Sequence, residues 1–368
     1  MHKNSILLNN YSFPFVLKAL ADLKLMKEGT LVHAQIVKVG FSNDIYVGNS
    51  LLNLYAASGD MGLCGKVFDE MLLRDVVSWT VMISGFKESG RFDEALIAFG
   101  RMRSEGVAPN QVTVVNALAA CACFGALDMG VWIHEHVKRN GWELDVILGT
   151  SLIVMYGKCG KTEEALFVFD EMKEKNVFTW NAVIKGLALS KGGKEAIRWF
   201  FRMEEKGIQP DEVTLISVLC ACAQSGFVHM GRRIFSLLAD GRFGFPPNVK
   251  HYACMVDLLA RSRCLDEAFK MINEMPFKPT VSLWGALLAG CRTQANVELG
   301  EIAAWKLVEL EPQNSAYYVV LSNLYAEMGK WSDVEKVRNL MRERGLKKDM
   351  GSSTVEFEHQ EHALDSVA

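Results

Sequence analysis

The chain has 368 residues, with 40 Lys and Arg against 43 Asp and Glu, so its formal net charge at neutral pH is −3. This balance excludes a strongly basic protein that binds nucleic-acid phosphates without sequence specificity. Its nine cysteines form no C-x-x-C pair, and together with the odd count this indicates a reducing compartment and no metal site.

The predicted elements are helices that come in pairs from residue 10 onward. Residues 1–9 lack a secretory core and an Arg- and Ser-rich transit sequence, and we interpret them as the remnant of a preceding repeat. Turn signals then divide the chain into ten units followed by a short polar tail at 349–368. The units are 10–44, 45–75, 76–110, 111–145, 146–176, 177–211, 212–248, 249–280, 281–314 and 315–348.

The segment 76–110 illustrates the expected helix pair. Apolar residues spaced three and four apart mark two helices, which are separated at Gly90, and the second ends at Gly106 with Pro109 beyond it. No stretch alternates with the period of two that a strand needs, so the fold class is predicted to be all-α. The most apolar stretch, 112–127, is interrupted by Asn116 and stopped by Asp128, which argues against a membrane span.

A shift of 101 residues superimposes the chain on itself without insertion. Ser78 to Gly85 returns as Thr179 to Gly186, and Pro109 returns as Pro210. Such a register predicts stacked repeats that bury a continuous core and present one extended concave face. The stretch Ala19-Leu-Ala21 returns with Cys121 and then Cys222 in place of the leucine, which indicates that these cysteines pack as small apolar residues.

The units resemble pentatricopeptide repeats of the plant PLS subfamily. The resemblance rests on the 35/31/35 length alternation and on motifs such as Val76 to Asn110. It extends to the terminal L- and S-type motifs at 212–248 and 249–280. Trp284 to Arg292 and Tyr317 to Ala326 resemble the two extension motifs, which are similar to tetratricopeptide repeats. It implies a right-handed superhelical solenoid of helix-turn-helix repeats, with eight repeats over 10–280 and the two extension motifs over 281–348.

The resemblance further implies sequence-specific binding of single-stranded organellar RNA, one base per repeat, usually to select a cytidine for C-to-U editing. In this family the fifth and last residues of each unit read the base, because amides and hydroxyls reach its Watson–Crick edge. Uracil-preferring pairs are expected at Asn49 with Asp75 and at Asn181 with Asp211. Adenine-preferring pairs are expected at Thr80 with Asn110 and at Thr150 with Asn176.

The remaining units are predicted to be spacers or weak contacts, because a proline or an aliphatic side chain cannot hydrogen-bond a base edge. Their fifth and last residues are Pro14 with Asp44, Val115 with Asp145, Ile216 with Asn248, and Ala253 with Thr280. The predicted RNA site is then 5′-U-A-N-A-U-N-N-N-N-N-C, with the last cytidine edited. A competing interpretation is that the polar fifth residues only cap helix starts.

The sequence contains no catalytic constellation and requires no cofactor. His359-Gln-Glu361 matches half of a deaminase motif, but no P-C-x-x-C follows it to complete a zinc site. His134-Glu-His136 does not have the four-residue spacing of a helical zinc pair. We expect a deaminase-carrying protein or another editing factor to act in trans through 281–348. If the chain is part of a longer reading frame, a deaminase domain would instead be missing from it.

Three alternatives remain open at this point. The same repeats would serve an RNA-binding protein that stabilises transcripts or assists splicing. A tetratricopeptide-like protein-binding scaffold would have no reason to keep the pairing of fifth and last residues, and a degenerate copy would have no function. The expected location is the mitochondrion, with the chloroplast as the alternative.

Overall fold

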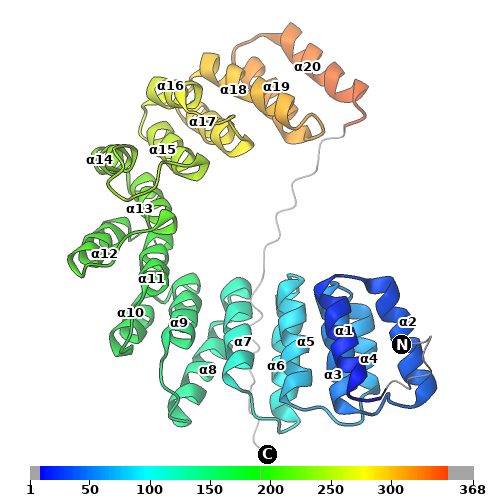
Figure 1. Cartoon of the computed structure of the whole chain (residues 1–368). Helices are drawn as coiled ribbons and strands as arrows, with labels where there is room; N and C mark the ends of the chain where they lie inside the picture. Colours follow the sequence, from blue (N-terminus) through cyan, green and yellow to red (C-terminus); the bar gives the residue numbers. More distant parts are fainter. Residues whose placement is uncertain (1–8, 191, 347–368) are drawn as a thin grey trace, which may run out of the picture. The chain divides into compact units, whose positions relative to one another are not determined.

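The computed structural model describes residues 9–190 and 192–346, and every regular element in these ranges is an α-helix (Figure 1). The all-α class predicted from the sequence is therefore confirmed. Most of the predicted remnant 1–9, Lys191 and the predicted tail 349–368 with His359 and Glu361 lie outside the described residues. In chain order the helices are α1 (Ser12–Asp22), α2 (Met26–Val39), α3 (Ile45–Ala57), α4 (Met61–Glu70), α5 (Val76–Glu88), α6 (Phe92–Ser104), α7 (Gln111–Phe124), α8 (Leu127–Arg139), α9 (Val146–Lys158), α10 (Thr162–Glu171), α11 (Val177–Leu189), α12 (Gly193–Glu205), α13 (Glu212–Ser225), α14 (Val228–Ala239), α15 (Val249–Arg261), α16 (Leu265–Glu274), α17 (Val281–Thr293), α18 (Val297–Leu310), α19 (Ser315–Glu327) and α20 (Trp331–Glu343).

Contacts divide the chain into two compact units. The first takes in the described residues up to 225 together with 236–246, and the second takes in 226–235 together with 247–346. The repeat pattern predicts one continuous solenoid and did not predict this division.

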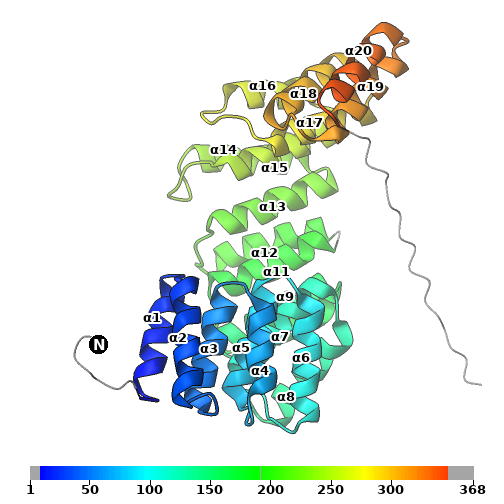
Figure 2. The same cartoon turned by 90° about the vertical axis from the view of Figure 1, so that its right-hand side faces the viewer.

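The first unit is a stack of helix pairs. Each odd-numbered helix from α1 to α11 packs against the next odd-numbered helix, and each even-numbered helix packs against its own odd-numbered partner. Figure 1 shows α9, α7 and α5 next to one another in this array, and Figure 2 shows the same helices from the side. The helix-turn-helix stacking expected of a solenoid is therefore present, and it lines up the same positions of successive odd-numbered helices.

Local sequence explains where the helices begin and end. Asp75 precedes α5, and its side chain accepts hydrogen bonds from the backbone N–H groups of Val77 and Ser78, which the helix itself cannot satisfy. The turn from α5 to α6 places Gly90 at a φ of +74°, which side chains other than glycine rarely adopt. Pro109 then lies buried just before the next N-cap, Asn110.

Small residues let neighbouring helices approach closely, as the alanine pattern predicts. A Cβ added to Gly186 on α11 would lie 3.3 Å from the Cα of Gly157 on α9, so the two backbones are in contact. Cys121 and Cys222 are fully buried in α7 and α13, and burial raises the pKa of each thiol to about 12. Both cysteines therefore remain protonated and pack as small apolar groups.

The second unit has a continuous apolar core that runs from α15 to α20. Trp284 and Tyr318, which lie in the two extension motifs, are buried in this core. Trp331 at the start of α20 is instead 67% exposed. Trp331 is thus available to a partner, whereas Trp284 and Tyr318 stabilise the fold.

Candidate functional site

The predicted reading residues occupy two fixed positions in the stack. The fifth residue of a unit lies in the second turn of an odd-numbered helix, and the last residue immediately precedes the next odd-numbered helix. Neighbouring odd-numbered helices pack side by side, so the two side chains face each other between adjacent units. The structure brings all four predicted pairs together, two by direct hydrogen bonds and two through a third side chain.

The two Asn/Asp pairs are joined directly. Nδ2 of Asn49 donates to Oδ1 of Asp75 at 3.2 Å. Nδ2 of Asn181 donates to Oδ1 and Oδ2 of Asp211 at 2.9 and 3.1 Å. Each pair therefore places an amide beside a carboxylate, which combines one donor group with a strong acceptor.

The carboxylate of Asp75 is held in its charged form. Partial burial alone would raise its pKa, but the backbone N–H of Ser78, the Asn49 amide, the Ser78 hydroxyl and the backbone N–H of Val77 together outweigh burial and lower the pKa below its usual value. All the hydrogen bonds that the structure gives the Asp75 carboxylate are accepted by Oδ1. Among the described residues Oδ2 has no partner, and it remains an acceptor for a ligand.

The two Thr/Asn pairs are linked through a threonine of the following helix. Oγ1 of Thr80 lies 2.6 Å from Oγ1 of Thr113, which in turn donates to Oδ1 of Asn110 at 2.8 Å. In the second pair, Oγ1 of Thr150 lies 3.0 Å from that of Thr179, which donates to Oδ1 of Asn176 at 3.3 Å. The asparagine Nδ2 groups have no partner among the described residues, so each pair offers amide donors beside a hydroxyl.

A third residue of every pair was missed by the sequence analysis. It is the third residue of the following unit, and its hydroxyl contacts one or both reading residues. The four hydroxyl side chains are fully buried, at 0% exposure: Ser78, Thr113, Thr179 and Thr214. The signal was present in the sequence, because these four units are followed by Ser or Thr at this position and the four spacer units are followed by Val47, Leu148, His251 and Leu283.

Most reading residues are accessible. Asn110 is exposed, and the other pair members are half-buried except Asn181, which is 6% exposed. Asp211 and Thr214 hold Asn181 on both sides, so only the outer edge of its amide faces solvent.

Helix capping by the fifth residues is wrong as an alternative interpretation. Thr80 lies a full turn inside α5, and its hydroxyl donates to the backbone oxygen of Val76 at 2.6 Å. Capping is instead performed by the last residues: Asn110 accepts from the backbone N–H of Thr113, and Asn176 from that of Thr179. These asparagines use Oδ1 for the cap, which leaves Nδ2 for a ligand.

The spacer units are arranged differently. Where the fifth residue is Pro14 or Val115, the last residue is held by an amide from the first position of the same unit. Nδ2 of Asn10 donates to Asp44 at 3.0 Å, and Nε2 of Gln111 donates to Asp145 at 2.6 Å.

The later spacer units also lack a reading pair. Ala253 has no polar side-chain atom, and the Thr280 hydroxyl contacts Ser282. Asn248 caps α15 through the backbone N–H groups of Lys250 and His251. Ile216 contributes only an aliphatic side chain.

An exposed apolar stripe accompanies the reading pairs and was also missed. The second residue of each of the first seven predicted units is a large apolar side chain left in solvent, and Phe178 is 66% exposed. A groove of about 300 Å³ between α1, α3 and α5 is lined by Asn49 together with Val77 and Phe15. The members of the stripe are Tyr11, Tyr46, Val77, Val112, Ile147, Phe178 and Val213.

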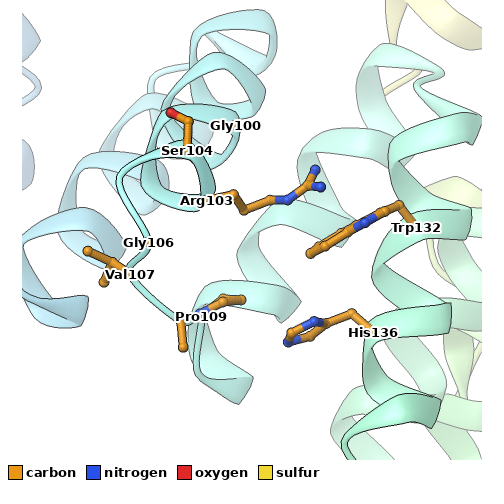
Figure 3. Close-up of a pocket in the computed structure, with 9 residues that line it drawn as sticks. Gly100, Arg103, Ser104, Gly106, Val107, Pro109, Trp132 and His136 are labelled. Atoms are coloured by element: carbon orange, nitrogen blue, oxygen red, sulfur yellow. The ribbon is translucent and has the colours of Figure 1, made fainter.

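A second pocket lies between α6 and α8 and has a volume of about 580 Å³ (Figure 3). The Arg103 guanidinium lies over the Trp132 ring at 3.3 Å, and the His136 ring stacks on the same tryptophan. Burial and the nearby Arg103 and Arg139 lower the pKa of His136, so it is neutral at physiological pH. These stacked groups tie α6 to α8 and stabilise the stack.

In the ranges 9–190 and 192–346, no group of His, Cys, Asp and Glu side chains is arranged to hold a metal ion. His134 contacts the Tyr156 hydroxyl through Nδ1 at 2.9 Å, and burial lowers its pKa to about 4. No helix in this part of the chain is long and apolar enough to cross a bilayer.

Comparison with known families matches three models, each of which describes a repeat or motif and not a catalytic domain. The PPR repeat family model matches residues 74–123 and 175–224, and the PPR repeat model matches 49–76, 150–177 and 251–278. The E motif model matches residues 294–356.

Curated relatives from Arabidopsis thaliana cover nearly the whole chain. One pentatricopeptide repeat-containing protein is 38% identical and is covered over 72% of its own length, with 96% of this chain aligned. A mitochondrial relative is 43% identical over 92% of this chain and 54% of its own length. The chloroplastic relative CRR2 is 37% identical over 100% of this chain and 57% of its own length. The chain thus spans roughly half to three-fifths of the length of most relatives that it matches.

Among solved structures, the chain is similar to the pentatricopeptide repeat protein PPR10 in complex with an 18-nt psaJ RNA element. The TM-score is 0.73, with 16% identity over 93% of this chain and 57% of the other. At this identity the likeness concerns the fold.

Proposed function

The chain belongs to the pentatricopeptide repeat family, and from this premise we propose that it binds single-stranded RNA in a base-specific manner and selects a cytidine for C-to-U editing. One observation carries the proposal: four units pair their fifth and last residues through hydrogen bonds and still leave polar atoms open to a ligand. A protein-binding scaffold has no need for this arrangement at every polar unit.

The two kinds of pair suit different bases. An aspartate only accepts hydrogen bonds, so the Asn49 and Asp75 pair suits a base that donates from its ring nitrogen, as uracil does at N3. Asn110 has Oδ1 occupied by Thr113 and offers Nδ2 as a donor, which suits the acceptor N1 of adenine. In chain order the pairs then correspond to 5′-U-A-N-A-U.

The exposed stripe supports binding of unpaired bases. Aromatic and aliphatic side chains such as Tyr46, Val77 and Phe178 provide apolar faces next to each reading pair. Base stacking on aromatic side chains contributes about 1–3 kcal/mol per base in single-strand binding. This contribution lets a chain of net charge −3 bind RNA without a large excess of basic residues.

Editing is favoured over transcript stabilisation or splicing by the E motif match at 294–356. We infer that α17 to α20, with the exposed Trp331, form the surface to which a deaminase-carrying partner docks. The chain itself then contributes recognition of the RNA, and the partner contributes the chemistry. The names of the relatives place them in mitochondria or chloroplasts, and we propose the mitochondrion for this chain.

Editing of a reporter RNA tests this proposal. The reporter carries 5′-U-A-N-A-U-N-N-N-N-N-C and is incubated in a plant organellar extract with the purified chain. We expect added protein to raise conversion of that cytidine, and we expect conversion to fall to background when both adenines become uracils. Conversion that ignores the adenines would contradict the proposed recognition.

A further inference from the structure

Four buried hydroxyl groups lie between adjacent units of the stack. We propose that the hydroxyl at the third position of the following unit is the third member of each base-reading site and determines which hydrogen-bonding groups the site presents. The proposal rests on the RNA-binding function given above, and adds a positioning and specificity residue to it. The four hydroxyls are those of Ser78, Thr113, Thr179 and Thr214.

The first support is the match between two positions within one chain. All four units with a polar fifth residue are followed by a unit with Ser or Thr at its third position. All four units with an apolar fifth residue are followed by Val, Leu, His or Leu there. Helix capping does not explain this match, because Asp44 and Asp145 cap their helices without a hydroxyl at that position.

The second support is the orientation of the asparagine amides. Oγ1 of Thr214 donates to Oδ1 of Asn181 at 2.5 Å, while Nδ2 of Asn181 donates to Asp211. A flipped amide would place Nδ2 against the hydroxyl and Oδ1 against the carboxylate, where two acceptors repel. The carboxylate therefore fixes the orientation of the amide, and the hydroxyl binds the amide oxygen. Ser78 has the same role for Asn49, because its Oγ donates to Oδ1 of Asn49 at 2.6 Å.

The third support is a count of hydroxyl hydrogens in the Thr/Asn sites. Thr80 and Thr113 have two hydroxyl hydrogens for three short oxygen–oxygen contacts, to Val76, between the two threonines and to Asn110, so two of these contacts take both hydrogens. Both hydrogens are consumed inside the protein. Thr80 therefore presents only lone pairs, and Asn110 presents only N–H donors. Without the Thr113 hydroxyl, Thr80 loses one of its two side-chain contacts, and Oδ1 of Asn110 keeps only its bond from the backbone N–H at position 113. Each group is then held by one contact fewer and can turn a different polar atom toward the base.

One consequence distinguishes this role from ordinary packing. The residue that sets the specificity of one unit belongs to the next unit along the chain. Thr113 lies in a predicted spacer unit, yet it controls the base read by Thr80 and Asn110. Thr179 lies in a uracil-reading unit, yet it controls the adenine read by Thr150 and Asn176.

The test uses two isosteric variants, Thr113→Val and Thr179→Val, in the full chain. Binding is measured by fluorescence anisotropy to RNAs that carry 5′-U-A-N-A-U, with the second and the fourth base varied separately through all four bases. We expect Thr113→Val to lose at least fivefold of its adenine preference at the second base and to keep the preference at the fourth. Thr179→Val should show the reverse, and Thr113→Ser, which keeps the hydroxyl, should match the parent chain.

The outcomes separate the two proposals. If the parent chain prefers adenine and both Val variants keep the same preference, the hydroxyl inference is refuted while RNA reading stands. If each Val variant loses discrimination equally at both bases, the hydroxyls are structural and the inference is also refuted. If the parent chain binds every RNA alike, the proposed function fails, and the inference fails with it. Each Val variant should keep its adenine preference at the base where the other loses it, so the retained preference shows that each variant is folded.

Discussion

Unit 76–110 allows its base preference to be converted from adenine to uracil. The double change Thr80→Asn with Asn110→Asp recreates the pair formed by Asn181 and Asp211, and the threonine that completes it is already present as Thr113. Asp and Asn are equally good N-caps, so the start of α7 is retained.

The magnitude follows from the groups that change partners. In the parent pair, Asn110 offers N–H donors; in the variant, the carboxylate at the same place accepts. A matched hydrogen bond contributes about 0.5–1.5 kcal/mol net, and a buried polar group left without a partner costs about 1–3 kcal/mol. The preference for adenine over uracil at the second base should therefore shift by about 2–4 kcal/mol, or roughly 30- to 900-fold.

Fluorescence anisotropy with four RNAs that differ only at the second base measures this shift. The double variant should bind 5′-U-U-N-A-U more tightly than 5′-U-A-N-A-U, while the parent chain shows the opposite order. The single variant Asn110→Asp, which keeps Thr80, should prefer neither base strongly. Retention of the parent's adenine preference by the double variant would refute the assignment of these residues as readers.

Four further predictions rest on other contacts. Asp75→Ala should lower the free energy of unfolding by about 1–2 kcal/mol in urea titrations, because two N–H groups of α5 lose their acceptor. The pKa of the Asp75 carboxyl is lowered in the fold, so its carboxylate should stabilise the protein above the unfolded pKa of about 3.9. This stabilisation should be lost as the pH falls through the lower folded pKa. The free energy of unfolding of Asp75→Asn, measured over the same pH range, should lack this component. Gly186→Val should cost about 1–3 kcal/mol because the new side chain meets the backbone of Gly157, whereas Gly100→Ala, whose added Cβ meets nothing within 4 Å, should be neutral or slightly stabilising by the same measurement. Phe178→Ala should weaken RNA binding by about 5- to 150-fold without changing the melting temperature, because this ring is exposed in the free protein; equal binding by the variant would remove the stripe from the RNA-binding surface.

Much of the fold was predictable because repeats constrain one another. The return of Ser78 to Gly85 as Thr179 to Gly186 places two helices in the same register, and each helix begins where a capping residue and an apolar period coincide. The division of the chain into two compact units was not predictable. The boundary falls within α14, and no local pattern of residues marks it.

The candidate site was predictable in part. The sequence identified four fifth residues through their partners at the unit ends: Asn49, Thr80, Thr150 and Asn181. In the structure the two asparagines contact their partners directly, and the two threonines are linked to theirs through one intervening threonine. The buried hydroxyls were missed because Ser and Thr near a helix start are ordinary capping-box residues, as Ser78 also is. Their second role depends on a contact across units, which becomes visible only when neighbouring helices are packed.

Base reading by these side chains is tested most directly by the affinity of the purified chain for two RNAs. One carries 5′-U-A-N-A-U before a cytidine, and in the other both adenines are uracils. Two mismatches at about 1 kcal/mol or more each predict binding at least roughly 30-fold weaker for the second RNA. Equal affinity for the two RNAs would contradict base reading and would favour a protein-binding scaffold.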